Sequence, residues 1–403
     1  LPFFVSIWHE KSENPGRSLP LVAFGAFSTS IIALEALVGG LITYVPTFLW
    51  SVGAVESIDA AWYRQVYWTI GHGSQQINLV AMITVWYFLT HVVGGAEVAS
   101  EKVSRTAFIL YVFFINMGAA HHLLADPAVS GGWRIWNASY AMYGAVGASL
   151  IHAFAIPAGL EVGLRKKGIG GDGWFGWLRK APWHDPSFSA TAFSIALFGF
   201  LGGITGVLVG QMQLNVMRHN TFAIPGHFHG TVAVGTTLAF MGLVYFVLDV
   251  SFLKKRVGKF LARIQPFLYA GAMGLAVMAM MVIGINWSVP RRHPAGLTLP
   301  GVEFDLAAAE PMMAVFGVTA LVAIVAGGLF LVVALATLLF GDRAEPSVPI
   351  PLQGPSGVRS GASDAHAYSM RGSFALCLLF AVSLGVLFWL DWAWLASLWQ
   401  FGA

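Results

Sequence analysis

Five of the twelve histidines lie in or beside strongly apolar segments, where an ionisable side chain is costly. His72 lies in "TIGHGSQQINLV", His121 and His122 lie in "AAHHLLADP", and His227 and His229 lie in "PGHFHG". Ionisable residues inside a membrane are rare and usually functional. Because five imidazoles recur in three separate segments, we predict a metal or cofactor site rather than buried structural histidines.

The spacing of these histidines indicates which of them can share a ligand. His227 and His229 are two residues apart, which is about 200° around an α-helix, so they should face opposite sides and serve two cofactors. His121 and His122 are adjacent at a predicted helix end and can converge on one ion if the last turn is distorted. His72 could supply a third imidazole. Three neutral imidazoles suit copper, zinc or iron, and axial histidines hold haem between helices.

The composition places these histidines in a membrane protein. Of 403 residues, 57% are hydrophobic and 10% are charged, whereas soluble domains carry about 25% charged residues. The single cysteine, Cys377, excludes a disulfide framework and a cysteine-ligated cluster within this chain. The net charge of +3 calls for no nucleic-acid partner.

Long apolar runs predict an all-α, polytopic transmembrane helical bundle. Runs of about 20 residues or more mark spanning helices, and we predict about nine, at residues 21–49, 66–94, 106–124, 135–163, 188–214, 227–250, 264–288, 311–340 and 372–394. We expect residues 1–18 to be a loop after the end of a missing helix and residues 19–340 to form the catalytic bundle. Residues 341–371 should be a polar linker, and residues 372–403 should carry an additional C-terminal helix. The sequence reads as part of a longer polypeptide or as one product of a split gene.

Positive charge predicts the orientation of this bundle. Seventeen Lys and Arg residues fall in the N-terminal segment and in the loops after the second, fourth, sixth and eighth predicted helices, and five fall on the opposite side. The positive-inside rule places the richer side in the cytoplasm. The N-terminal end should therefore be cytoplasmic, and the C-terminus should be outside.

Four motifs resemble the catalytic subunit of the haem–copper oxidoreductase superfamily, and its B-type branch most closely. They are "GHGSQQ", "HHLLADP", "HNTFAIPGHFHGTVA" and "NWSVPRRH", and their order and spacing are very specific. The resemblance covers nearly all of the chain except the last helix. It implies the later helices of a twelve-helix fold in the inner membrane of a prokaryote.

The resemblance also implies a role for each motif residue. His72, His121 and His122 would bind the B-site metal, which we expect to be copper, with iron as the alternative. His227 would be the proximal ligand of a high-spin haem, and His229 would bind a low-spin haem. The haem propionates would lie near a polar group whose two arginines can bind carboxylates bidentately: Arg291, Arg292, His219 and Asp126.

Gln76 departs from the pattern of the family. It lies four residues after His72, where oxygen reductases of this branch have a tyrosine cross-linked to that histidine and iron-type nitric oxide reductases have a glutamate. Glutamine is not readily redox-active. Reducing O₂ takes four electrons, whereas reducing two NO to N₂O takes two. We therefore favour nitric oxide reduction. The alternative is an oxygen reductase whose tyrosine comes from elsewhere, or a tyrosine-less site with low oxidase activity.

Buried polar residues elsewhere could serve proton transfer. Glu35 in "IIALEALVGG" could hydrogen-bond Gln76, approach the metal, relay protons, or be a structural acid paired with a polar neighbour. Tyr87, Ser149 and His152 are candidates for a path from the cytoplasm. That path is thin, so protons could instead enter from the outer face, without charge crossing the membrane.

The resemblance finally implies partners. The second axial histidine of the low-spin haem would come from an N-terminal part or from a separate chain. Electrons would come from a cupredoxin (CuA-type) or cytochrome c subunit, with quinol as another donor. A transporter or channel whose histidines carry protons is the competing class, and it would contain no haem.

Overall fold

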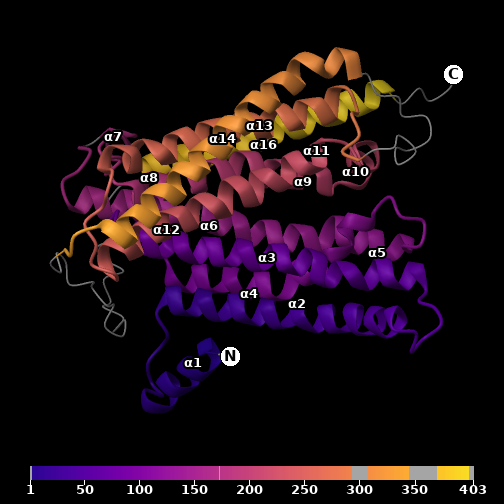
Figure 1. Cartoon of the computed structure of the whole chain (residues 1–403), viewed down its shortest axis with the longest axis horizontal. Helices are drawn as coiled ribbons and strands as arrows, with labels where there is room; N and C mark the ends of the chain where they lie inside the picture. Colours follow the sequence, from indigo (N-terminus) through magenta and orange to yellow (C-terminus); the bar gives the residue numbers. More distant parts are fainter. Residues whose placement is uncertain (1, 172, 293–305, 345–369, 399–403) are drawn as a thin grey trace.

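The described part of the chain is a bundle of long helices without a β-sheet, which confirms the predicted all-α membrane fold. The computed structural model describes residues 2–171, 173–292, 306–344 and 370–398. Figure 1 shows most of the long helices running roughly along one axis, with α2 packed along α3 and α13 packed along α14.

The described elements include short 3₁₀ and π segments (η) between the α-helices. They are, in order, α1 (Pro2–Glu13), α2 (Leu21–Ser51), α3 (Ala60–Val92), α4 (Glu101–Met117), η1 (Ala119–Leu123), α5 (Gly131–Trp136), η2 (Asn137–Ala141), α6 (Met142–Lys166), α7 (Gly176–Arg179), α8 (Pro186–Leu197), η3 (Phe198–Gly203), α9 (Ile204–Gly210), α10 (Met212–Arg218), α11 (Ala223–His229), η4 (Gly230–Thr236), α12 (Thr237–Val250), α13 (Lys259–Asn286), α14 (Leu306–Phe340) and α16 (Arg371–Leu398).

Eight helical segments of the described chain are long and apolar enough to cross a membrane, so the chain is a multi-pass membrane protein. The ninth predicted segment, α3, has 33 residues and is long enough to span. Gln75, Gln76 and Asn78 lower its hydropathy, so it is not among the eight. The helix that departs from the membrane pattern is therefore the one that carries His72.

Capping side chains set several helix starts before the predicted ones. Asp59 accepts a hydrogen bond from the Trp62 N–H at 2.6 Å, and α3 begins at Ala60 rather than at residue 66. Asp185 accepts from the Ser187 N–H at 2.7 Å, with Pro186 in the first helical turn. An Asp at the N-cap satisfies an N–H group that the helix leaves free.

The N-terminal segment corrects one prediction. Residues 1–18 were expected to form a loop, but Pro2–Glu13 forms α1. Figure 1 shows α1 outside the bundle, beneath α2. The segment has only a short apolar run, so the length criterion for a spanning helix did not detect it. The predicted linker at residues 341–371 lies mostly outside the described residues.

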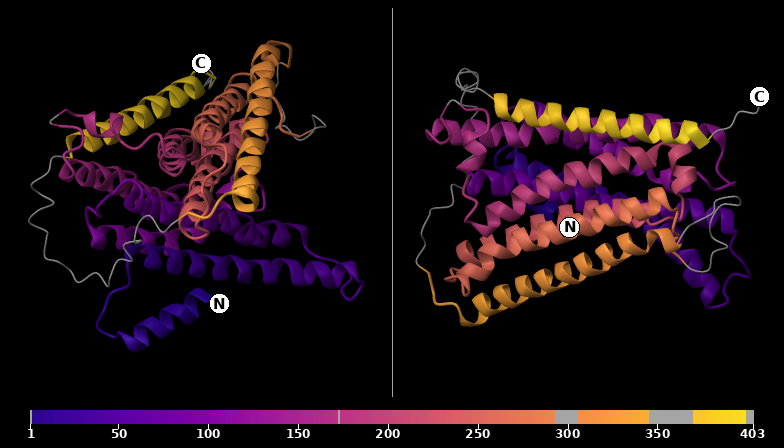
Figure 2. Two further views of the ribbon diagram at one scale, coloured as in Figure 1. Left: turned by 60° about the vertical axis from the view of Figure 1, so that its left-hand side comes forward. Right: turned by 90° about the horizontal axis from the view of Figure 1, so that it is seen from above.

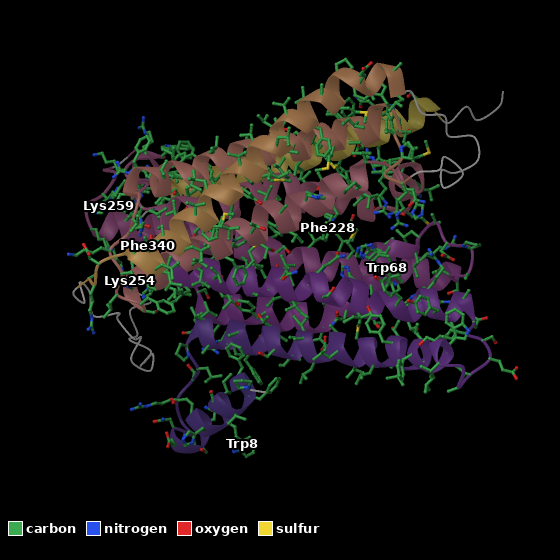
Figure 3. All side chains as sticks on the ribbon, viewed as in Figure 1. Trp8, Trp68, Phe228, Lys254, Lys259 and Phe340 are labelled. Atoms are coloured by element: carbon green, nitrogen blue, oxygen red, sulfur yellow. The ribbon has the colours of Figure 1, made fainter. Side chains whose placement is uncertain are left out.

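The two ends of the bundle differ in chemistry. Figure 3 places Lys254 and Lys259 at the end of the molecule opposite to Trp68. Trp68 lies one helical turn before His72 on α3, so the histidines lie toward the end that carries few basic residues. We call this the histidine end, and the other the basic end.

The last helix, α16, lies along one edge of the bundle (Figure 2) and is held at both ends by buried charge. Toward the basic end, fully buried Glu161 of α6 pairs with Arg165 at 2.7 Å and accepts from the Ser373 N–H at 2.7 Å and from the Ser373 hydroxyl at 2.8 Å. At the histidine end, Arg218 of α10 pairs with Asp391. Buried charges persist only when they are paired.

We expect Glu161→Leu to lower the free energy of unfolding by about 3–5 kcal/mol, because it leaves Arg165 buried without its partner. The matched control is Glu97→Leu, which breaks the exposed Lys166–Glu97 pair and should cost under about 1 kcal/mol. Reversible unfolding in mixed micelles measures both. Equal losses in the two variants would contradict the proposed anchoring of α16.

Candidate functional site

Three imidazoles from α3 and η1 form a potential metal site. The ligand nitrogens of His72, His121 and His122 all lie within 4.8 Å of one another, and His72 Nδ1 is 3.0 Å from His122 Nε2. Metal–imidazole bonds are about 2.0–2.1 Å long, so two ligand atoms of one ion stand at most about 4.2 Å apart. The three side chains therefore fit one transition-metal ion after small side-chain adjustments.

A distorted helix end brings His121 and His122 together, as their adjacent positions predicted. The α-helix α4 ends at Met117, and Ala119–Leu123 continues as the 3₁₀ segment η1. The Asn137 side chain at the start of η2 accepts from the Ala120 N–H at 3.0 Å and donates to the Trp133 carbonyl at 3.0 Å. Asn137 thus fixes the turn that carries both histidines.

Other contacts fix the orientation of the rings. His122 stacks on Trp68, with ring centroids 4.0 Å apart and an interplanar angle of 8°. His121 Nδ1 is hydrogen-bonded to the Gly118 carbonyl, which leaves Nε2 for a metal. Holding the second ring nitrogen fixes the tautomer and orientation of a metal-binding histidine.

His227 and His229 face different surroundings, as their spacing predicted. His227 lines the same cavity as the three-histidine cluster, and its Nδ1 lies 3.1 Å from the Thr205 hydroxyl of α9. A Cβ atom on Gly206 would stand 2.9 Å from the His227 ring, so glycine is needed beside it. His229 does not line that cavity, and its Nδ1 donates to the Pro225 carbonyl at 2.7 Å. The two rings therefore have Nδ1 contacts with different groups, and only His227 lines the cavity.

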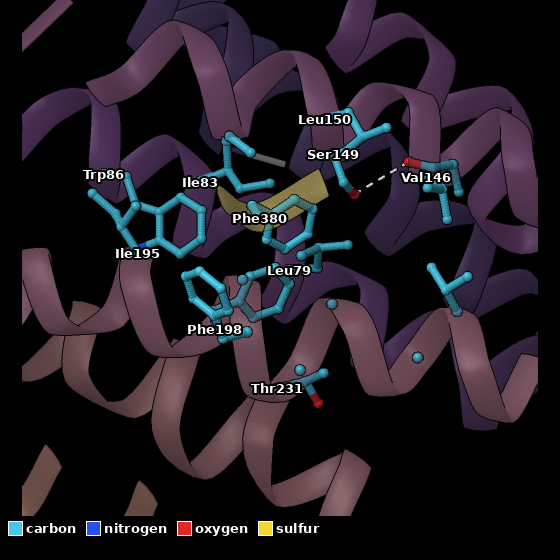
Figure 4. Close-up of a pocket in the computed structure, with 18 of the residues that line it drawn as sticks. Leu79, Ile83, Trp86, Val146, Ser149, Leu150, Ile195, Phe198, Thr231 and Phe380 are labelled. Carbon is cyan, nitrogen blue, oxygen red and sulfur yellow. Dashed lines mark hydrogen bonds between the residues drawn. The ribbon is translucent and has the colours of Figure 1, made fainter. Parts of the chain in front are cut away.

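An apolar cavity of about 780 Å³ connects the three-histidine cluster with His227. It begins at His72, His121, His122 and His227, is walled by α3, α4, α6, η3, η4 and α16, and reaches toward Trp177 of α7. Figure 4 shows Ile83, Phe198, Thr231 and Phe380 on its walls. All three π segments, η2, η3 and η4, contribute to its lining, in keeping with the frequent occurrence of π-bulges at functional sites. Its size and apolar lining suit a large flat cofactor such as haem.

Gln76 also lines this cavity, one helical turn after His72. The structure gives its side chain no hydrogen-bond partner within the described residues. Tyr111 of α4 lines the cavity too, and its hydroxyl lies 2.8 Å from that of Ser149. Sequence reasoning missed Tyr111, although Tyr111, Gly118 and His121 recur at the helical spacing of one face.

Glu35 lies outside the three-histidine cluster. Its carboxyl group accepts a hydrogen bond from the Asn116 amide, and Glu35 is not part of the cavity lining. The other amide atom, Asn116 Oδ1, is buried without a partner among the described residues, and a Cβ on Gly73 would stand 3.0 Å from it. Of the roles considered for Glu35, the structure displays the pairing with a polar neighbour.

The candidate proton-path residues form two adjacent groups. The Tyr87 hydroxyl donates to Ser104 at 2.9 Å and lies 3.0 Å from His152 Nδ1. The second group is Tyr111 with Ser149, and the Tyr111 ring stacks against His152 with centroids 5.6 Å apart. His152 Nε2 is buried without a partner among the described residues. Ser104 and Tyr111 were not foreseen.

A charged cluster covers the histidine end of the site. Arg64 pairs with Asp126, and Arg134 donates to the Asp126 backbone carbonyl. Burial raises the pKa of Asp126, but the hydrogen bond and charge of Arg64 outweigh it and hold that pKa below its ordinary value. Burial and the nearby positive charge of Arg291 lower the pKa of His219.

Arg291 has a donor to spare within this cluster. Its backbone N–H donates to the Asn220 carbonyl at 2.8 Å, whereas its Nε is buried without a partner among the described residues. Arg292 is exposed. An unpaired buried guanidinium nitrogen fits an additional carboxylate such as a haem propionate.

Comparisons with known proteins show the family of this chain. Residues 1–323 match the family described as cytochrome c and quinol oxidase polypeptide I. Cytochrome c oxidase subunit 1 of Thermus thermophilus is 30% identical over 359 residues, which are 86% of this chain and 61% of the relative. The subunit 1 of Debaryomyces hansenii is 24% identical over 293 residues, which are 69% of this chain and 49% of the relative.

A solved structure supports the same fold. The cryo-EM structure of a haem–copper terminal oxidase dimer superposes with a TM-score of 0.78 at 25% sequence identity, over 94% of this chain and 67% of that chain. The chain spans about three fifths of the length of the Thermus relative. The family match, the fold and the histidine geometry agree, and the chain belongs to the cytochrome c and quinol oxidase polypeptide I family, whose members are haem–copper proteins.

Proposed function

We propose that this chain carries the active site of a respiratory membrane reductase that converts two NO to N₂O and water with two electrons and two protons. The observation that carries this proposal is Gln76, which lines the cavity one turn after His72 where the oxygen-reducing relatives have a tyrosine. The proposal includes a location in a prokaryotic inner membrane, with the N-terminal end cytoplasmic and the C-terminus outside.

The cofactor assignment follows the donor atoms. His72, His121 and His122 hold copper, because no carboxylate shares their cluster among the described residues and Glu35 is engaged with Asn116. Iron remains the alternative. His227 holds a high-spin haem and His229 a low-spin haem, with Arg291, Arg292, His219 and Asp126 near the propionates. When bound, the haem iron and copper supply the substrate-binding positions and the two electrons.

Gln76 shapes the site without supplying redox equivalents. Its amide can donate and accept hydrogen bonds toward the cavity, but it yields neither an electron nor a proton at neutral pH. Tyr111 lines the same cavity from α4, but its hydroxyl is engaged with that of Ser149 at 2.8 Å, and it does not lie on the turn of α3 that follows His72. Two-electron chemistry needs no such group.

Oxygen reduction is the alternative function, and two observations favour it. Tyr111 lines the cavity, and the named relatives are cytochrome c oxidase subunits. In this alternative Tyr111 of α4 would supply the electron without a cross-link to His72.

Protons for either reaction would be carried by groups already in contact. Tyr87, with Ser104 and His152, lies toward the basic end, and Tyr111 with Ser149 opens into the cavity. The contact between Tyr111 and His152 joins the two groups. Glu35 would be a proton-holding group behind the cluster rather than a metal ligand.

The proposed enzyme needs partners. His229 Nε2 has no hydrogen-bond partner among the described residues, so it could bind a low-spin haem, which requires a second axial ligand from an N-terminal part or a separate chain. A cupredoxin (CuA-type) or cytochrome c subunit would deliver the electrons.

The substrate is tested by anaerobic NO consumption with N₂O detection against O₂ uptake, using one artificial donor. We expect NO turnover to exceed O₂ turnover by at least about tenfold, because tyrosine-free sites lack the electron source that O–O cleavage needs. High O₂ turnover with negligible NO turnover would overturn the proposal.

A Gln76→Tyr variant probes what the missing tyrosine would do. We expect it to lower NO turnover, because the larger ring fills cavity space, without creating substantial O₂ reduction, since a cross-link also requires geometry and a proton supply. Gln75→Tyr, at the neighbouring cavity-lining residue, is the control. Robust O₂ reduction by Gln76→Tyr alone would show that this residue decides the substrate.

Metal analysis tests the copper assignment and the part played by Asn137. We expect one copper per chain, and in Asn137→Leu a roughly 10- to 100-fold weaker copper affinity, because the turn carrying His121 and His122 loses its support. Asn78→Leu is the control, since the Asn78 amide bonds the Ser74 carbonyl of its own helix. Unchanged copper affinity in Asn137→Leu would remove Asn137 from the site.

A further inference from the structure

The α16 helix lies beyond the matched family region, residues 1–323, yet it forms part of the cavity wall. Its cavity-lining side chains recur at helical spacing: Phe374, Leu376, Cys377, Phe380, Ala381 and Leu384. Four of them, Leu376, Cys377, Phe380 and Leu384, are half-buried, whereas Leu379 and Val382 between them are each 54% exposed. One face of α16 is therefore turned to the cavity, and the other is turned outward, where lipid would contact it.

This face packs on the segment that positions His227. Phe380 contacts Phe200 of η3 edge-to-face, with ring centroids 5.6 Å apart, and would lie 3.7 Å from a Cβ on Gly199. The segment η3 is followed directly by α9, which carries Thr205, and the Thr205 hydroxyl contacts His227 Nδ1. Figure 4 shows the Phe380 ring among Ile83, Ser149 and Leu79, which come from α3 and α6. Phe380 thus faces the interior of the cavity and not the lipid.

Two buried polar anchors keep this wall in place. Glu161 holds the first residues of α16 toward the basic end, and Arg218 holds Asp391 at the histidine end. Only 6% of the most apolar part of α16 is buried, so apolar packing alone contributes little to holding the helix against the bundle. Charged groups inside an apolar bundle are costly, and anchors at both ends are explained if the stretch between them has to be held against a cavity.

We propose that α16 is a wall of the binding pocket of the haem held by His227, and that Phe380 and Leu384 contact its apolar edge. The cavity is continuous from His227 to these two side chains, has a volume of about 780 Å³ and is lined mainly by apolar groups. Without α16 this side of the cavity would open to the lipid. The α16 wall therefore retains the haem and excludes lipid chains from the site.

The proposal rests on the assignment of His227 as a haem ligand, and it is independent of whether NO or O₂ is the substrate. It also predicts an internal control. His229 lies outside this cavity, so a second haem on that side should be unaffected by changes in α16.

The test uses the full-length protein with its natural subunits and measures the haem that binds CO. Transfer of this haem to apomyoglobin should be at least about tenfold faster in Phe380→Ala than in the unmodified protein, because a large aromatic contact is lost. The matched control, Leu379→Ala, truncates the neighbouring outward-facing side chain and should leave the rate unchanged. Equal transfer rates in the two variants would overturn the proposal.

A second pair of variants adds bulk instead of removing it. Leu384→Trp should reduce the CO-binding haem per chain to less than half while the low-spin haem absorbance persists, whereas Leu387→Trp, at a side chain that is 43% exposed, should retain both haems. An unchanged amount of CO-binding haem per chain in Leu384→Trp would also refute the proposal that α16 is a wall of the haem pocket. Unmodified protein without any CO-binding haem would instead refute the assignment of His227.

Discussion

The convergence of three imidazoles inside an apolar bundle is the constraint on which the rest of the structure depends. The nitrogens of His72, His121 and His122 lie within 4.8 Å of one another, although regular α-helices place neighbouring residues about 100° apart. The chain meets this demand by leaving the regular α-helix at His121 and His122, whereas His72 stays within the α-helix α3. The 3₁₀ segment η1 turns His121 and His122 to one side, and the π segments η2 and η4 lie directly beside the site. Each irregularity exposes backbone groups, and Asn137 satisfies one of them.

The sequence predicted the helices and the histidines of this arrangement, but not the polar side chains that hold them in place. Hydrophobic runs predicted the spanning helices, and spacing predicted that His227 and His229 diverge and that the turn at His121 is distorted. Asn137, Tyr111 and Asn116 escaped prediction because their partners are distant along the chain, as with Tyr111 and Ser149 or Asn116 and Glu35. Residue type alone does not distinguish such contacts from ordinary polar residues. The short helix α1 escaped because it has only a short apolar run.

In the proposed function, Gln76 limits a chemistry that the histidines by themselves would permit. The histidine cluster and the His227 pocket would suit either of the two reductions, since both need an open metal position facing a haem. The difference lies in how many electrons must arrive together. Gln76 lies four residues after His72 on α3 and lines the cavity, as does its neighbour Gln75. An amide there can orient a small polar substrate, but it cannot contribute to a four-electron step.

The charges at the two ends of α16 follow the same physical logic as the histidines. A polar group inside the bundle is retained where it holds an element that apolar packing would not fix by itself. The Glu161 carboxylate of α6 accepts from Arg165, whose guanidinium also donates to the Gly171 carbonyl in the following loop. The same carboxylate accepts from the Ser373 N–H at the start of α16. Arg218 is the last residue of α10, and His219 of the charged cluster follows it directly in the chain. The ion pair that anchors α16 and the charged cluster near the proposed propionates therefore share one short segment. A shift of α16 would change the proposed haem site through this backbone segment as well as through the Phe380 side chain.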